Sequence, residues 1–226
     1  MITGPTALTM SYRIIETEAD IAEGAGALVR DCVYMARVYE VTGPPPLRRR
    51  ENGFPGLARI IVGQQLSVAS AGAIWGRFEN AVHPFDAGTL LRKRQGTLRK
   101  CGLSAGKIKT LRTIAEAIRG GTLDLSVLAG AQEDEIRQTL TALKGVGPWT
   151  ADIYIMFCLG RADAWAPGDL ALKYAVRGSC GLEELPDEAA MLEMAERWRP
   201  WRGVAARMLW AWYGLRRTRE RSAAPL

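Results

Sequence analysis

LTALKGVGPWTA, residues 140–151, is the stretch of sequence that decides the fold. An amphipathic helical pattern leads into it and ends at Gly145-Val146-Gly147, and Pro148 suits the first turn of a second helix. The two glycines let the backbone bend tightly and approach a partner closely. The stretch therefore predicts two helices joined by a short hairpin.

The start of the second helix is a predicted anion site. Backbone N–H groups freed at a helix start face outward, and the positive end of the helix dipole lies behind them. A DNA phosphate fits such a site without reference to base sequence. The alternative is an ordinary turn between two packed helices, and a Gly-x-Gly turn alone does not separate the two interpretations.

A second informative stretch, APGDLALK, spans residues 166–173. In it Pro167 and Gly168 precede Asp169, which opens an apolar helical run. Aspartate is a favoured helix N-cap, and that role alone explains its position. A carboxylate fixed at a cleft also stabilises a sugar that becomes positive as its base departs, and it helps to orient an attacking water. Asp169 is therefore either a structural cap or a catalytic carboxylate.

The composition limits the kinds of chemistry that the chain can carry. Lys and Arg outnumber Asp and Glu by 30 to 24, which favours a polyanionic partner or simply a solvated basic surface. The single histidine is His83, and the four cysteines are too far apart for a zinc or iron–sulfur motif. We therefore expect no metal site. No apolar run reaches membrane-spanning length, so we expect a cytoplasmic protein associated with DNA.

The rest of the chain predicts an all-α fold, a two-lobed helical bundle with an interlobe cleft. Strand-like alternation is confined to residues 12–15, and the chain from Arg216 onward is expected to fray. We expect residues 1–54 to pack with a C-terminal lobe of residues 164–226, and residues 55–163 to form a central lobe that contains the hairpin. Helical periodicity covers residues 19–29, 33–41, 57–62, 68–78, 107–118, 133–143, 149–159, 170–177, 186–198 and 203–215.

These motifs resemble a known family. The hairpin of residues 143–151 and the trailing Pro167-Gly168-Asp169 are similar to the helix-hairpin-helix DNA glycosylase superfamily. Three further stretches resemble its alkylbase branch, the AlkA-like 3-methyladenine DNA glycosylase II enzymes, in a compact form. These stretches are IVGQQLS at residues 61–67, GLS with Lys107 at residues 102–107, and WRPWR at residues 198–202.

The resemblance assigns roles to individual residues. It places Asp169 at the catalytic aspartate, and Gly145, Gly147 and Thr150 at the hairpin positions whose backbone holds a DNA phosphate. In relatives that also cut the strand, a lysine nucleophile stands at the position of Trp149. A tryptophan cannot form a Schiff base, so the resemblance implies a monofunctional enzyme that leaves the strand intact.

The resemblance also implies a base pocket and a wedge. An enzyme that acts on a base must extrude it, and an electron-rich indole attracts a cationic alkylated base. Trp149 and Trp210 are the predicted pocket tryptophans, whereas Trp75, Trp165 and Trp201 are expected in the core. Ile153 stands where some relatives have a pocket tyrosine, which leaves the substrate range open. Gln65, with Gln64, is the predicted wedge, although both glutamines could instead cap a helix break.

The sequence thus predicts a monofunctional DNA glycosylase that excises alkylated bases of the 3-methyladenine and 7-methylguanine type. Its expected partner is double-stranded DNA containing such bases, and it is expected to act as a monomer without a cofactor. A monovalent cation on the hairpin carbonyls is implied by the resemblance alone. The alternatives are a non-catalytic helix-hairpin-helix DNA-binding protein and a glycosylase for other damaged bases.

Overall fold

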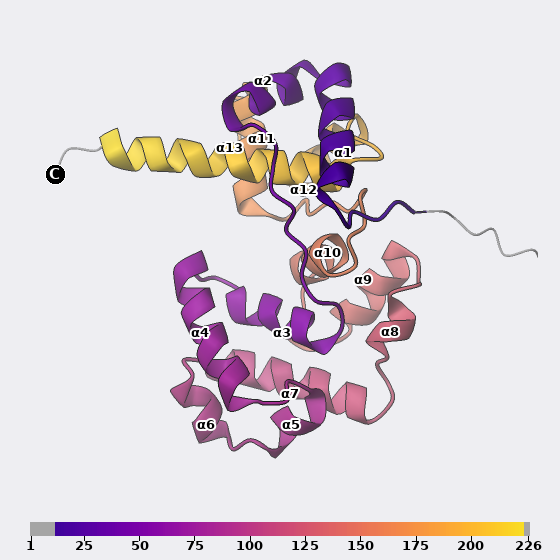
Figure 1. Ribbon diagram of the computed structural model, residues 1–226, viewed down its shortest axis with the longest axis vertical. Helices are drawn as coiled ribbons and strands as arrows, with labels where there is room; N and C mark the ends of the chain where they lie inside the picture. The colour runs from indigo at the N-terminus through magenta and orange to yellow at the C-terminus, as the bar shows by residue number, and fades with distance from the viewer. Residues whose placement is uncertain (1–11, 224–226) are drawn as a thin grey trace, which may run out of the picture.

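A computed structural model describes residues 12–223 and arranges them as two helical lobes joined through a central helix, α10 (Pro148–Phe157) (Figure 1). All eight residues from 150 to 157 are buried, as expected for a helix with packed neighbours all around it. The two lobes lie on opposite sides of this helix.

The lower lobe in Figure 1 is built from consecutive segments. Its longest helix, α7, packs against both α3 and α5, and α9 packs against α10. The members are α3 (Phe54–Gly63), α4 (Val68–Ala81), α5 (Ala87–Arg92), α6 (Gln95–Lys100), α7 (Ala105–Arg119), α8 (Leu125–Leu128) and α9 (Glu133–Thr141).

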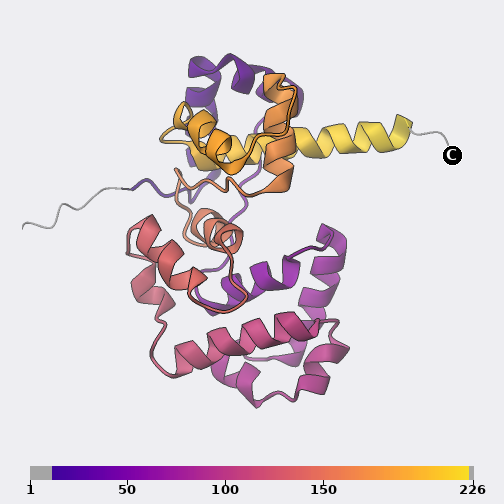
Figure 2. The same cartoon turned by 180° about the vertical axis from the view of Figure 1, so that it is seen from behind.

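The upper lobe combines the two ends of the described chain. The N-terminal helices α1 (Glu18–Asp31) and α2 (Val33–Thr42) pack against the C-terminal α13 (Arg202–Ala223), which also contacts α11 (Leu170–Cys180). The remaining helix of this lobe is α12 (Glu188–Glu196). Seen from behind, α11 and α13 stand above α10, with α4 below the projecting end of α13 (Figure 2).

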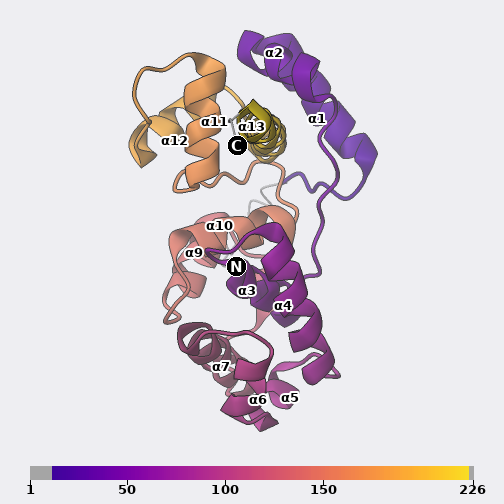
Figure 3. The same ribbon diagram turned by 90° about the vertical axis from the view of Figure 1, so that its left-hand side faces the viewer.

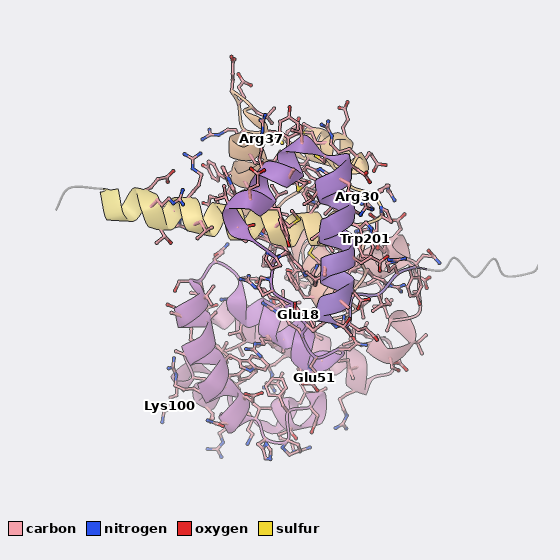
Figure 4. The ribbon with its side chains drawn as sticks, turned by 45° about the horizontal axis from the view of Figure 1, so that its top comes forward. Glu18, Arg30, Arg37, Glu51, Lys100 and Trp201 are labelled. Carbon is pink, nitrogen blue, oxygen red and sulfur yellow. The ribbon has the colours of Figure 1, made fainter. Side chains whose placement is uncertain are left out.

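Close packing of small on large side chains fixes α1 against the C-terminal helices. A Cβ at Gly24 of α1 would lie 2.6 Å from the indole of Trp201, so only glycine allows this approach. Figure 4 shows Trp201 beside α1, whereas Lys100 marks the far end of the other lobe. The predicted core positions of Trp75, Trp165 and Trp201 are confirmed, since each is no more than 6% exposed.

Most predicted helices are present, and the all-α fold class is confirmed. The strand-like alternation at residues 12–15 forms no strand but only an isolated antiparallel bridge between Ile14 and Arg161. The expected fraying from Arg216 is wrong for residues 216–223, which continue α13 as a helix, and residues 224–226 lie outside the described residues. Within the described residues, no helix combines the length and apolar character needed to cross a bilayer.

Three short helices escaped prediction for a common reason. α5 and α6 have six residues each and α8 has four, so none completes the two turns that would reveal a 3.6-residue period. Two of them begin at aspartate caps: Asp86 accepts from the Thr89 backbone N–H at 2.7 Å, and Asp124 caps α8.

Candidate active site

The hairpin between α9 and α10 places its backbone against α7. Gly145 has φ +91°, a conformation that favours glycine, and an added Cβ would lie 1.9 Å from the Thr110 hydroxyl oxygen. Gly147 has φ −97° and no atom within 4 Å of an added Cβ. The first glycine is therefore required by conformation and close packing, whereas the second leaves its surroundings open.

The start of α10 presents unpaired backbone donors. The Gly147 carbonyl accepts from the backbone N–H groups of Thr150 at 3.0 Å and Ala151 at 3.2 Å, which closes the first turn. Within the described chain, no acceptor pairs with the N–H groups of Gly145, Gly147 and Trp149. Thr150 itself is buried and its N–H is engaged, so the donors available to an anion are those of the other three residues.

Asp169 gathers three elements around one carboxylate. It caps α11, and its Oδ1 accepts from the Leu172 backbone N–H at 2.8 Å and from the Trp210 indole Nε1–H at 3.1 Å. Its Oδ2 accepts from the Trp149 indole Nε1–H at 2.7 Å. The residue is 9% exposed, and among the described residues no cation pairs with it. The carboxylate is thus held by neutral donors alone.

The two predicted pocket tryptophans therefore meet at Asp169 from two different helices. Trp149 is the second residue of the central helix α10 and Trp210 lies in α13 of the upper lobe, and both side chains are half-buried. Trp210 also packs against Phe157, with ring centroids 5.6 Å apart. Their indole N–H groups orient the carboxylate, which is a role that the sequence did not indicate.

The segment between α3 and α4 separates the two predicted wedge glutamines. Gln64 Nε2 donates to the Thr150 hydroxyl oxygen at 2.9 Å, so Gln64 is tied to the hairpin. Gln65 has φ +56°, which is uncommon for a residue other than glycine, and its side chain is exposed. Leu66 and Val68, at 39% and 92% exposure, continue this protruding surface. Gln65 therefore keeps the predicted wedge position, whereas Gln64 is a structural link.

Lys107 of α7 holds this segment in place. Its Nζ donates to the backbone carbonyls of Val62 at 2.7 Å and Gln64 at 2.8 Å, where α3 ends. Burial lowers the pKa of Lys107. A cation at the C-terminal end of a helix is favourable, and here it also fixes the turn that presents Gln65. The sequence contained Lys107 in a family motif but gave no sign of these partners.

A family model described as HhH-GPD superfamily base excision DNA repair protein matches residues 58–200. The matched range includes the hairpin, Asp169 and the segment between α3 and α4. The chain belongs to this superfamily.

Known members with similar sequences and structures agree with this assignment. DNA-3-methyladenine glycosylase 1 of Schizosaccharomyces pombe is 31% identical over 165 residues, which cover 71% of this chain and 72% of the relative. The solved structure of a 3-methyladenine DNA glycosylase from that organism, in complex with abasic DNA, superposes with a TM-score of 0.77 at 28% identity, over 83% of this chain and 95% of that one.

A DNA-3-methyladenine glycosidase from Bacillus halodurans also superposes, with a TM-score of 0.72 at 31% identity, over 92% of this chain and 95% of that one. The family resemblance predicted from the sequence is confirmed by these comparisons.

Two further features of this HhH-GPD protein concern the surroundings of the site. Ile153 is 5% exposed and lies one turn after Trp149 on the same face of α10, so it is a buried residue rather than a surface one. In the described part of the chain, no cluster of three or more His, Cys, Asp or Glu side chains is placed to hold a metal ion.

Proposed function

We propose that this protein is a monofunctional DNA glycosylase that excises alkylated bases of the 3-methyladenine and 7-methylguanine type from double-stranded DNA in base excision repair. The observation that carries the proposal is the Asp169 carboxylate, nearly buried and held by two indole N–H groups and one backbone N–H. The names of its relatives support the substrate class.

The hairpin binds the DNA backbone. The N–H groups of Gly145, Gly147 and Trp149 lie at the positive end of α10, where a phosphate oxygen accepts hydrogen bonds. Gln65, which protrudes before α4, fills the space that an extruded nucleotide leaves in the duplex. A monovalent cation on the hairpin carbonyls, implied by the family resemblance, stays a prediction.

Asp169 supplies the electrostatics of bond cleavage. When the N-glycosidic bond breaks, its electron pair leaves with the base and positive charge develops on the sugar. A fixed carboxylate stabilises that charge, orients the water that adds to the sugar carbon, and accepts the proton that this water loses. An alkylated base that is already cationic departs neutral without being protonated, so this site needs no general acid beside Asp169.

The tryptophans connect substrate choice to this carboxylate. A desolvated indole attracts a cationic ring by about 1–2 kcal/mol more than a neutral one, and Trp149 and Trp210 both contact Asp169. Trp149 also stands at the position where a lysine would be needed for strand cleavage through a Schiff base. The product is therefore an abasic site in an intact strand.

The decisive experiment is base release by the Asp169→Asn variant. Methylated DNA is incubated with the protein, and free bases are separated by chromatography. Because the amide removes the negative charge, we expect release of 3-methyladenine and 7-methylguanine to fall by about 100–1,000-fold or more, whereas affinity for duplex DNA persists. Asp152→Asn, at a second buried aspartate outside the site, is the matched control and should retain release.

Undiminished release by Asp169→Asn would exclude the assigned role. Duplex binding by the wild-type protein without any base release would indicate a non-catalytic DNA-binding protein instead. A nick in the strand without alkali would indicate lyase chemistry.

A further inference from the structure

Two tyrosines and two arginines form a continuous surface beside the Asp169 site. Tyr174 of α11 and Tyr213 of α13 stack with ring centroids 6.1 Å apart and planes 12° from parallel. The Arg177 guanidinium lies over the Tyr174 ring at 5.4 Å, and that of Arg217 lies over the Tyr213 ring at 5.7 Å. We call these four residues the tyrosine–arginine strip.

The charges of the strip are uncompensated. In the described part of the chain, no carboxylate lies within ion-pair distance of Arg177 or Arg217. By contrast, Arg216 on the same helix pairs with Glu220 at 3.4 Å. Tyr174 is 36% exposed and Leu170, one turn before it, is 58% exposed, so the strip is open to a ligand. Two arginines that lie over aromatic rings, without a carboxylate, form a surface suited to an anion.

Helix geometry places the strip next to the carboxylate. Arg217 follows Trp210 by seven residues, two turns, so both side chains project from the same face of α13 at positions about 10 Å apart. Arg177 follows the cap residue Asp169 by eight residues, about 12 Å along α11. Both arginines therefore lie within about three nucleotide steps of the site, at a rise of ~3.4 Å per nucleotide.

The second half of α13 projects from the body of the protein. In Figure 1 it extends past α2 and α11, above the start of α4, and in Figure 3 it points toward the viewer over α10 and α4. The exposed segment that contains Gln65 precedes α4 on that same side. A duplex that reaches Asp169 between the lobes thus passes beneath α13.

We propose that the tyrosine–arginine strip is a second DNA-backbone site, which binds phosphates of the strand flanking the extruded nucleotide from the lobe opposite the hairpin. This proposal rests on the proposed function, because it takes duplex DNA as the ligand. The hairpin holds the backbone through main-chain N–H groups of one lobe, and the strip holds it through guanidinium groups of the other. The backbone of the damaged DNA is then bound on both sides of Asp169.

The chemistry of the strip fits a phosphodiester. A guanidinium presents parallel N–H donors that match two phosphate oxygens, and stacking on a ring fixes its plane before binding. Such contacts carry no base specificity, which suits an enzyme that must bind around a lesion in any sequence.

The test compares two arginines of the same helix. Arg217→Ala removes a strip residue, whereas Arg219→Ala removes the same charge two residues later on α13, at an angle of about 160° from Arg217, where Arg219 lines a different surface hollow together with Val41 of α2. Binding to a fluorescein-labelled duplex with one abasic-site analogue is followed by fluorescence polarisation across a KCl series. Thermal unfolding followed by circular dichroism verifies that each variant is folded.

We expect the Arg177→Ala, Arg217→Ala double variant to bind about tenfold more weakly, and the slope of log affinity against log salt to fall by about 0.9 for each phosphate that the variant no longer neutralises. Arg217→Ala alone should show about half of the slope change, and Arg219→Ala almost none. Equal affinities and equal salt slopes for Arg217→Ala and Arg219→Ala would overturn the proposal that the strip binds DNA phosphates. If the two variants are equal but the wild-type protein still releases bases, the proposed function is not affected. A wild-type protein that neither binds the duplex nor releases bases would overturn both the proposed function and the role of the strip.

Discussion

Asp152 and Asp169 are both nearly buried carboxylates, at 4% and 9% exposure, yet their partners differ in kind. Asp152 of α10 receives the charged guanidinium Nε–H of Arg137 at 2.7 Å. Asp169 receives only neutral N–H groups, from two indoles and one backbone amide. Asp152 is therefore paired with a cation, whereas the negative charge of Asp169 has no counter-ion.

This difference separates a structural carboxylate from one suited to catalysis. An ion pair cancels most of the field that either group exerts on its surroundings. Oriented dipoles hold a carboxylate in place while its charge remains available to a developing cation. The Asp169 site therefore has the character expected of a group that acts on a positive sugar, whereas Asp152 joins α9 to α10.

The largest effect should follow from breaking the Asp152 pair. Arg137→Met leaves that carboxylate buried without a cation, so we expect the free energy of unfolding at pH 9 to fall by about 3–5 kcal/mol. At neutral pH the loss should be smaller, because the unpaired carboxyl takes up a proton. Urea denaturation followed by circular dichroism measures this decrease. Adding Asp152→Asn to the Arg137→Met protein should recover a large part of the lost stability. If Arg137→Met alone were as stable as the wild type, Asp152 would not depend on its ion pair.

A second test uses the pH dependence of stability. Burial raises the pKa of Asp152 from 3.8 to about 6 despite Arg137, with Glu133 and Glu188 adding to the increase. The folded state thus binds this proton more tightly than the unfolded state, so the associated stability is complete below about pH 4 and is lost as the pH rises to about 6. In Asp152→Asn this pH-dependent change, at most about 3 kcal/mol, should disappear.

The measurement is the difference in unfolding free energy between wild type and Asp152→Asn from pH 4 to 6. Other carboxylates titrate alike in both proteins, so the difference isolates Asp152. A difference that stays constant over this range would show that its proton is held no more tightly in the folded state.

The smallest effect should come from removing one neutral donor at Asp169. Trp149→Phe keeps an aromatic ring but removes the N–H at 2.7 Å, so we expect the single-turnover rate of base release to fall by about tenfold, about 1.4 kcal/mol in activation free energy. Trp212→Phe is the matched control, because Trp212 is half-buried in α13 without contacting Asp169. Equal rates for both variants would show that the indole N–H does not position the carboxylate.

Asp169 and Trp149 lie at recognisable local positions in the sequence, whereas Trp210 was assigned to the pocket by the family resemblance alone. Asp169 follows Pro-Gly at a helix start, and Trp149 follows the glycine turn. The convergence of all three side chains was not predictable, since Trp210 lies 41 residues from Asp169 and is brought there by packing of α13 on α11.

Contacts between distant segments account for what the sequence could not indicate. The bond from Gln64 to Thr150 joins residues 86 positions apart, and Lys107 reaches carbonyls more than 40 positions away. Neither the charges of the residues nor the helical periodicity of the sequence indicates such pairs. In the sequence, Arg137 and Asp152 are ordinary charged residues of two helices. Their ion pair in the structure is what distinguishes Asp152 from Asp169.

The packing of α1 and α2 against α13 has a consequence for how the protein is made. The helices α1 and α2 are synthesised before α13, against which they bury their apolar faces, and Gly24 lies against Trp201, 177 positions later in the chain. All segments of the lower lobe are synthesised before α13. The upper lobe, which carries Asp169, cannot be completed until translation has passed residue 210. During that interval, α1 and α2 expose surface that the finished protein hides, so nascent chains should depend on chaperones for the upper lobe more than for the lower.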